Sequence, residues 1–161
     1  MMMKKLAVLL LSLLLLIPAT APAEGSVLLL EIPDDAQMVE NIAFDDGDFI
    51  QTYQRGGMTL QLLRYASFDM TLNDLIESEW TGCSDVQALD IAQAGGFPAE
   101  GVKLRYEQEG TGAVDVTLVL VRSAQSTLVF SAVVPLGDSE NAALVEAMVR
   151  SMDVLGETEV G

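Results

Sequence analysis

The chain has 161 residues, of which 24 are acidic and 8 are basic, and its formal net charge at neutral pH is −16. A surface this negative repels nucleic acid and anionic lipid, so we expect neither as a partner. The sequence contains no histidine. This excludes His-based metal sites and catalysis that relies on a histidine base.

The N-terminal segment has the three zones of a secretory signal peptide. Two lysines precede an apolar run at 6–17, and a small-x-small pattern ends at Ala23. We therefore predict a signal peptide over residues 1–23, cleaved between Ala23 and Glu24. The alternative is an uncleaved membrane anchor, but the apolar run is shorter than the roughly 20 residues that a spanning helix needs.

Cleavage would leave residues 24–161, a length suited to one domain. It removes Lys4 and Lys5 and no acidic residue, so 8 − 2 = 6 basic side chains remain beside 24 acidic ones, a net charge of 6 − 24 = −18. The first mature residue would be Glu24, where lipidation requires a cysteine. We expect a secreted or extracytoplasmic protein that is soluble and has no stable membrane insertion after cleavage.

The first half of this domain is predicted to hold strands joined by short turns. An apolar run at 27–32 ends in a Pro-Asp-Asp turn, and residues 45–48 form a second, acidic turn. Runs at 49–55 and 58–65 flank a Gly-Gly pair, and glycine adopts the positive φ of a hairpin turn without steric cost.

Residues 71–80 change to a helical period. Apolar side chains recur every three or four positions up to Trp80, with polar side chains on the opposite face. Thr71 is suited to cap the helix, and Asp74 stands three residues later, as in a capping box. We predict a helix over this segment.

The second half is predicted to be mainly strands. Residues 86–93 form a strand, and a glycine-rich turn at 95–98 leads into an alternating strand at 102–107. Strands at 114–121 and 127–134 follow after tight turns, so the last three form an antiparallel meander.

A C-terminal helix is predicted from Asp138 or Ser139 to about Met152, followed by a short closing strand at 154–155. Strands followed by a helix, more strands and a second helix indicate the α+β class. The strand at 114–121 is apolar on both faces, so each face needs cover. We predict a single three-layer α/β/α sandwich with a central antiparallel sheet.

Several of these features together resemble the PsbP-like superfamily. They are the first strand ending in Ile-Pro-Asp, the mid-chain helix, the Gly-Gly-Phe-Pro-Ala turn at 95–99, and the meander before a helix ending in Met-Val-Arg-Ser-Met-Asp-Val at 148–154. The resemblance spans residues 27–155. It rests on packing and turn motifs and not on a reaction signature.

The resemblance implies an α/β/α sandwich and a role in binding. The superfamily includes photosystem extrinsic subunits, a nuclear-transport cofactor and bacterial exported proteins. Its members act by binding partners and share no enzymatic activity. No functional residue carries over to this sequence, and a fold alone does not specify a function.

The densest acidic turn is a candidate cation site. Asp45, Asp46 and Asp48 place hard oxygen ligands at a short spacing that Ca²⁺ can use. The EF-hand pattern is absent, since position 12 counted from Asp45 is Gly56. The alternative is a solvated turn before a strand. We expect no cofactor, with calcium at this turn as the one alternative.

Catalytic patterns are weak. Asp74, Glu77 and Glu79 on the predicted helix offer paired carboxylates, as a glycosidase would need, but they fall on its polar face. A Ser-Lys site would have to use Lys103, the only lysine after residue 23, and no Ser-x-x-Lys spacing precedes it.

Other single residues are candidates for contact with a partner. Trp80 and Met58 mark a possible partner surface, although Trp80 is also suited to close the edge of the core. Cys83 is the only cysteine and therefore a free thiol unless chains pair. The arginines on predicted strands are expected to form ion pairs; they are Arg55, Arg64, Arg105 and Arg122.

These observations favour an exported, non-enzymatic accessory or binding domain, with an unknown protein or small ligand as its partner. One alternative is a calcium-responsive protein that uses the loop at 45–48. A second is a carboxylate-based hydrolase.

Overall fold

The structure is a computed structural model that describes residues 27–65, 69–123 and 126–155. The predicted signal peptide and its cleavage point lie outside these residues. The main sheet has the strand order β2-β3-β4-β9-β8-β7-β5, and its neighbouring strands are antiparallel. Its strands are β2 (Gln37–Ala43), β3 (Phe49–Arg55), β4 (Met58–Tyr65), β5 (Ser84–Ala88), β7 (Phe97–Gln108), β8 (Gly112–Arg122) and β9 (Thr127–Pro135).

The remaining elements lie around this sheet. The short β6 (Gln93–Ala94) pairs with the start of β7, and β1 (Val27–Leu29) pairs antiparallel with β10 (Asp153–Leu155). The helices are α2 (Leu72–Glu79) and α3 (Ser139–Arg150). No helix in the described ranges is long and apolar enough to cross a membrane.

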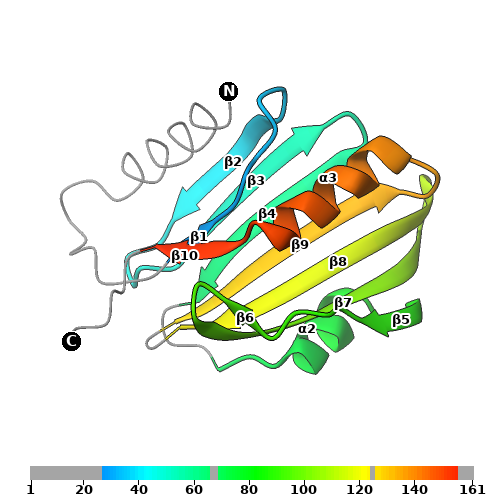
Figure 1. The fold of residues 1–161 in the computed structure, drawn as a ribbon. Helices are drawn as coiled ribbons and strands as arrows, with labels where there is room; N and C mark the ends of the chain where they lie inside the picture. The colour runs from blue at the N-terminus through cyan, green and yellow to red at the C-terminus, as the bar shows by residue number, and fades with distance from the viewer. Residues whose placement is uncertain (1–26, 66–68, 124–125, 156–161) are drawn as a thin grey trace.

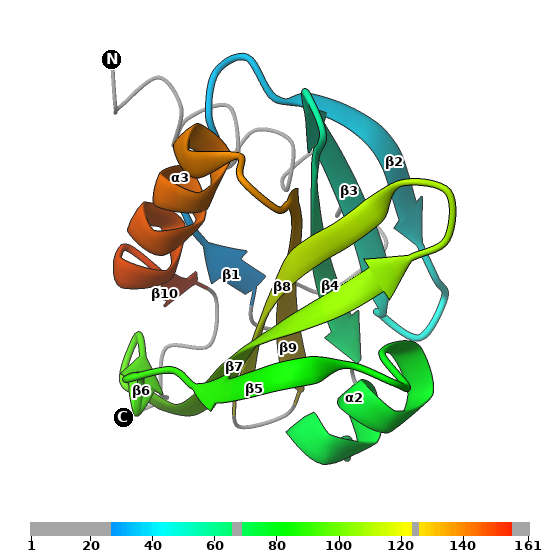
Figure 2. The same ribbon diagram turned by 90° about the vertical axis from the view of Figure 1, so that its right-hand side faces the viewer.

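The two helices contact opposite faces of the sheet. Figures 1 and 2 show α3 and the β1–β10 pair on one face and α2 on the other. The alternation of β8 explains this arrangement, because Val119 and Val121 belong to the core under α3 while Leu118 and Leu120 belong to the core under α2. The predicted α+β class is confirmed.

Several predicted elements agree closely with the structure. The hairpin around the Gly-Gly pair is β3–β4, and the meander is β7–β8–β9. The capping box of α2 is present, with the Asp74 N–H donating to the Thr71 hydroxyl oxygen at 3.1 Å. The closing strand is β10.

Other boundaries were wrong for physical reasons. The strand predicted over 27–32 ends at Leu29. The strand predicted over 86–93 is two strands, β5 and β6, because the chain leaves its regular pairing with β7 after Ala88 and pairs with β7 again only at Gln93. β2 was missed because it lies at the sheet edge and is almost wholly exposed, so its sequence lacks an apolar alternation.

The turn between β6 and β7 packs against β10 through a glycine. A Cβ built on Gly95 would lie 2.6 Å from the Val154 backbone nitrogen, and the φ of Gly95 is +57. Gly96 also has a positive φ, +84, but a Cβ there meets no described atom within 4 Å. A side chain at Gly96 would therefore cause backbone strain alone, whereas a side chain at Gly95 would cause both backbone strain and a steric clash.

We therefore expect Gly95→Ala to destabilise the fold more than Gly96→Ala. The left-handed backbone costs about 1–2 kcal/mol for either alanine, and overpacking against β10 adds about 1–3 kcal/mol for Gly95→Ala alone. Urea unfolding of both variants measures the difference. Equal free energies of unfolding would contradict the close contact with β10.

Two buried polar side chains lie on β3 in the core under α3. Tyr53 is 6% exposed and Gln51 is 0% exposed. Neither the Tyr53 hydroxyl nor the Gln51 amide has a hydrogen-bond partner among the described residues. Burial raises the pKa of Tyr53 to about 12 from its ordinary value of 10.0, because the interior disfavours the phenolate.

We expect the Tyr53 shift to make stability fall at high pH. The unfolded chain loses this proton near pH 10.0 and the folded chain only near about 12, so the free energy of unfolding decreases between these values. Tyr53→Phe should remove this part of the decrease and leave stability at pH 7 unchanged or higher, because it deletes an unpaired buried hydroxyl. Urea unfolding of both proteins at several pH values is the measurement. A variant with the same high-pH slope as the parent would contradict the shift.

Candidate functional site

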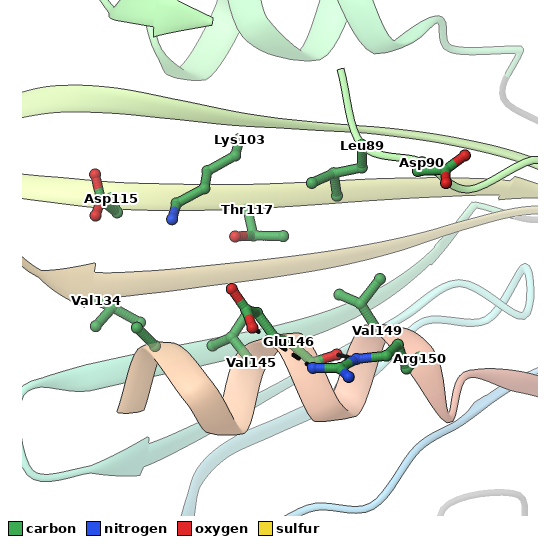
Figure 3. A pocket seen from close by; sticks show the side chains of 11 residues that line it. Leu89, Asp90, Lys103, Asp115, Thr117, Val134, Val145, Glu146, Val149 and Arg150 are labelled. Atoms are coloured by element: carbon green, nitrogen blue, oxygen red, sulfur yellow. Dashed lines mark hydrogen bonds and ion pairs between the residues drawn. The ribbon is translucent and has the colours of Figure 1, made fainter. Parts of the chain in front are cut away.

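A groove of about 550 Å³ lies between α3 and the α3-facing side of the sheet. Figure 3 shows α3 as one wall, β7, β8 and β9 as the floor, and the segment after β5 as the opposite wall. Apolar side chains supply the walls and charged side chains lie among them. The lining residues are Leu89, Asp90, Lys103, Asp115, Thr117, Val134, Ala142, Val145, Glu146, Val149 and Arg150.

A glycine allows the wall opposite α3 to form. The Leu89 N–H donates to the Gly101 carbonyl oxygen at 2.9 Å, which holds the segment after β5 against β7. A Cβ on Gly101 would lie 2.9 Å from Leu89 Cδ1 and 3.0 Å from the Leu118 carbonyl oxygen. Only glycine leaves room for the Leu89 side chain at this place.

The other wall, α3, is fixed at its N-terminus by Asn141, which is 4% exposed. Its amide oxygen accepts from Arg55 Nη1 at 2.7 Å, and its amide nitrogen donates to Asp138 Oδ2 at 2.7 Å. Arg55 also forms ion pairs with Asp35 and Glu140, both at 2.8 Å. The hydrogen bonds from Arg55 to Asp35 and Glu140 raise the pKa of Arg55 above its ordinary value, and the one to Asp35 has the larger effect.

We expect Asn141→Ala to lower the free energy of unfolding by about 1–3 kcal/mol, because it leaves buried polar groups unpaired. Asn73→Ala is the control, since Asn73 is exposed on α2 and surface substitutions usually change stability by less than about 0.5 kcal/mol. Urea unfolding measures both variants. If the two lose equal stability, the Asn141 hydrogen bonds do not hold α3.

One cation in the groove, Lys103, has no counter-ion among the described residues. Lys103 on β7 pairs across the sheet with Thr117 on β8, and Figure 3 shows its amine between Asp115 and Thr117 in that view. No carboxylate of the described residues lies within 4.0 Å of the Lys103 amine, the limit for an ion pair. In a chain with net charge −16, an unpaired cation inside a groove is unusual.

The arginines beside the groove, Arg105 and Arg150, are paired, whereas the lining carboxylate of Asp90 forms no ion pair with a described residue. Arg105 Nε lies 3.3 Å from Asp115 Oδ1, and its Nη1 lies 3.6 Å from Asp85 Oδ2. Arg150 lies 3.5 Å from Glu146, one turn away on α3. Lys103 and Asp115 also line a smaller cavity of about 170 Å³, together with Asp85 from the bulge of β5.

This arrangement suits binding of an amphipathic molecule. The valines and Leu89 can bury an apolar body, and Lys103 with the Thr117 hydroxyl can bind one anionic group. The described lining contains no cysteine or histidine and only one hydroxyl side chain. The lining also contains three carboxylates, Asp90, Asp115 and Glu146.

No family model and no curated protein matches the sequence. Among solved structures, the solution structure of cyanobacterial PsbP (CyanoP) from Synechocystis sp. PCC 6803 is 11% identical, covers 85% of this chain and 96% of that chain, and has a TM-score of 0.52. The chain has a PsbP-like fold. At this identity the likeness shows the fold alone.

Two further solved structures are similar to this chain. LpqN of Mycobacterium tuberculosis, described as involved in cell envelope biogenesis, is 16% identical, covers 84% of this chain and 86% of that one, and has a TM-score of 0.42. PA94 from Pseudomonas aeruginosa, a protein of unknown function described as a putative regulator, is 18% identical, covers 74% and 86%, and has a TM-score of 0.43.

The predicted calcium loop is the turn between β2 and β3, away from the groove. Asp46 Oδ1 accepts from the Asp48 N–H at 3.0 Å, as in an Asx turn. Asp45 is exposed beside them. In the described part of the chain, no three His, Cys, Asp or Glu side chains gather closely enough to hold a metal ion. Calcium binding at Asp45, Asp46 and Asp48 stays a prediction.

The carboxylates predicted on α2 are also separate from the groove, because α2 covers the opposite face. Asp74 is part of the helix cap, and hydrogen bonds from the Thr71 backbone and side chain lower its pKa. Glu77 and Glu79 are exposed. The structure therefore assigns Asp74 a structural role at the start of α2.

The residues predicted for a partner surface have different environments. Trp80 is partly buried and makes an edge-to-face contact with Tyr106 at 5.3 Å between ring centroids, which closes the core under α2. The prediction that Met58 lies on the surface was wrong. It is 0% exposed because alternate residues of β4 point into the core. Cys83 is a free, partly buried thiol packed against the α2-side core.

The arginines form the expected ion pairs at three positions. Arg55 and Arg105 are paired as described above, and Arg122 lies 3.0 Å from Asp69. Arg64 is 9% exposed on β4 and does have an interaction partner. Sequence reasoning did not find the groove. The available signal was that Lys103, the only lysine after residue 23, lies on an alternating strand.

Proposed function

We propose that this chain is an exported, non-enzymatic binding domain whose groove holds a small molecule with an apolar body and one anionic group. In this proposal residues 1–23 are removed as a signal peptide, and residues 24–161 act as a single three-layer α/β/α domain outside the cytoplasm. The PsbP-like fold is compatible with such a role and does not specify it.

The observation that carries the proposal is that Lys103, in a groove with apolar and acidic lining residues, has no ion-pair partner in the described part of the chain. A buried or half-buried cation is normally matched by a carboxylate, and this protein has 24 acidic residues from which to supply one. Arg105 and Arg150 beside it are matched. An anionic ligand such as a carboxylate would complete the groove, with the Thr117 hydroxyl as a second hydrogen-bond donor.

The test uses octanoate, with octanol as its uncharged counterpart, and follows backbone amide signals by NMR. We expect octanoate to shift signals of α3, β7 and β8, and Lys103→Gln to weaken its binding by about tenfold or more, because a hydrogen bond to a charged group contributes about 1.5–3 kcal/mol. Arg122→Gln removes the same charge from the α2 side of the sheet and should leave octanoate binding unchanged.

A second variant tests the apolar part of the groove. Val149→Trp would fill the space beside α3 and should abolish octanoate binding while the β4 and β9 signals stay in place. Equal weakening by Lys103→Gln and Arg122→Gln would show a general charge effect and refute a specific site. Signals that move on α2 instead of α3 would place binding on the wrong face.

A further inference from the structure

The edge strand β2 is a second candidate for recognition, independent of the groove. β2 is the last strand of the main sheet, and among the described strands its one sheet neighbour is β3 (Figure 2). An edge strand presents backbone donors and acceptors to any extended chain that approaches it. All residues of β2 except Met38 are exposed, so no described element covers this edge.

The hydrogen bonds at the end of β2 show which backbone groups point outward. The Phe44 N–H donates to the Asp48 carbonyl oxygen at 2.9 Å, so the backbone of Phe44 faces β3. Backbone groups alternate in direction along an antiparallel strand. The N–H and C=O of Asn41 and Ala43 therefore face away from β3 and are the groups available to an added strand.

The end of β2 and the residue that follows it expose large apolar side chains, Ile42 in the strand and Phe44 directly after Ala43. Ile42 is 39% exposed and Phe44 is 49% exposed. They lie two residues apart and so share one face of the strand, and Ile42 pairs across the sheet with Ile50. Edge strands are usually protected by lysine, proline or irregular geometry. The bulge of β2 ends before Glu40, which leaves the stretch that follows regular.

The opposite edge of the sheet differs in this respect. β5 also exposes an apolar side chain, Val86 at 52%, but its register shifts between Ser84 and Gln87. The φ of +52 at Asp85 lies inside that bulge. This irregular geometry makes β5 less able to pair with an added strand. β5 is therefore a suitable control for β2.

The sequence around β2 is acidic, and a basic group paired with it is Arg55 of β3, which lies 2.8 Å from Asp35. Residues 31–48 contain seven acidic side chains and no basic one. A second copy of this chain would bring the same charges against this edge, which disfavours self-pairing. A partner with lysine or arginine next to an apolar strand is complementary to it. The acidic residues are Glu31, Asp34, Asp35, Glu40, Asp45, Asp46 and Asp48.

We propose that β2 binds an extended segment of a partner protein by strand addition. The segment is apolar at its centre, where it contacts Ile42 and Phe44, and carries basic residues toward its ends, where it meets the acidic turns. Its backbone pairs with Asn41 and Ala43. Main-chain hydrogen bonds supply the affinity and the side chains supply the selection, as in other cases of β-augmentation.

The test uses synthetic peptides with blocked ends on the full-length mature chain. The first has a lysine pair at each end and alternating valine and threonine between them. The second has glutamate in place of lysine, and the third has proline in place of threonine, which removes backbone donors. We expect the first peptide to shift amide signals of β2 and β3, and its affinity to fall with added salt. The other two peptides should bind at least about tenfold more weakly than the first.

Variants of the protein locate the site. Phe44→Ser should weaken the first peptide by about tenfold, because burial of this side chain is lost, whereas Val86→Ser on the opposite edge should not. Ala43→Pro should abolish binding, since it removes an outward-facing N–H. The amide spectrum of each variant without peptide shows whether the variant is folded. Octanoate binding in the groove is a second check of folding, and the amide spectrum is sufficient if octanoate does not bind to the parent protein.

Three outcomes would overturn the proposal. Equal binding of the lysine and glutamate peptides would remove the requirement for a basic partner. Equal effects of Phe44→Ser and Val86→Ser would show that β2 is not the site. Concentration-dependent self-association of the chain without peptide, abolished by Phe44→Ser in sedimentation experiments, would assign the edge to a second copy of the protein.

Discussion

The burial of β8 on both faces is the constraint on which the rest of this structure depends. Its side chains alternate between two cores, so the sheet requires cover on each side, and α2 and α3 provide it. On the α3 side, β8 changes from the polar pair Asp115 and Thr117 to the apolar pair Val119 and Val121. The groove begins where this face turns polar, because complete cover by α3 is needed only over the apolar part.

Charge is distributed to match this architecture. Arg55, Arg105 and Arg122 each lie beside carboxylates, and Arg55 joins the turn before β2 to the start of α3. The excess negative charge remains on exposed turns and on the segment that includes β2. Lys103 differs from these arginines, because its strand places it on the groove floor and no carboxylate in the described ranges forms an ion pair with it. The two proposed recognition sites therefore bind partners of opposite charge: the groove binds an anionic group, and β2 binds a basic segment.

Much of the fold was predictable from local signals, and the groove was not. The Gly-Gly turn and the alternation of the meander strands act over a few residues, so β3, β4, β7, β8 and β9 were recognised. β2 was missed because an exposed edge strand needs no apolar periodicity. The groove brings Leu89, Lys103 and Val149 together through strand register and the packing of α3, and such long-range pairing leaves no mark in a single sequence. Met58 shows the same limit, since its burial depends on the direction of β4.

The position of the single tryptophan has a practical consequence for spectroscopy of this protein. Trp80 packs on Tyr106 in the core under α2, on the other side of the sheet from the groove and distant in sheet order from β2. Its fluorescence therefore reports whether the α2-side core is intact and is insulated from direct contact with a molecule in the groove. Intrinsic emission can serve as a label-free monitor of folding while occupancy is followed by another method, so a loss of binding and a loss of structure can be told apart in one sample.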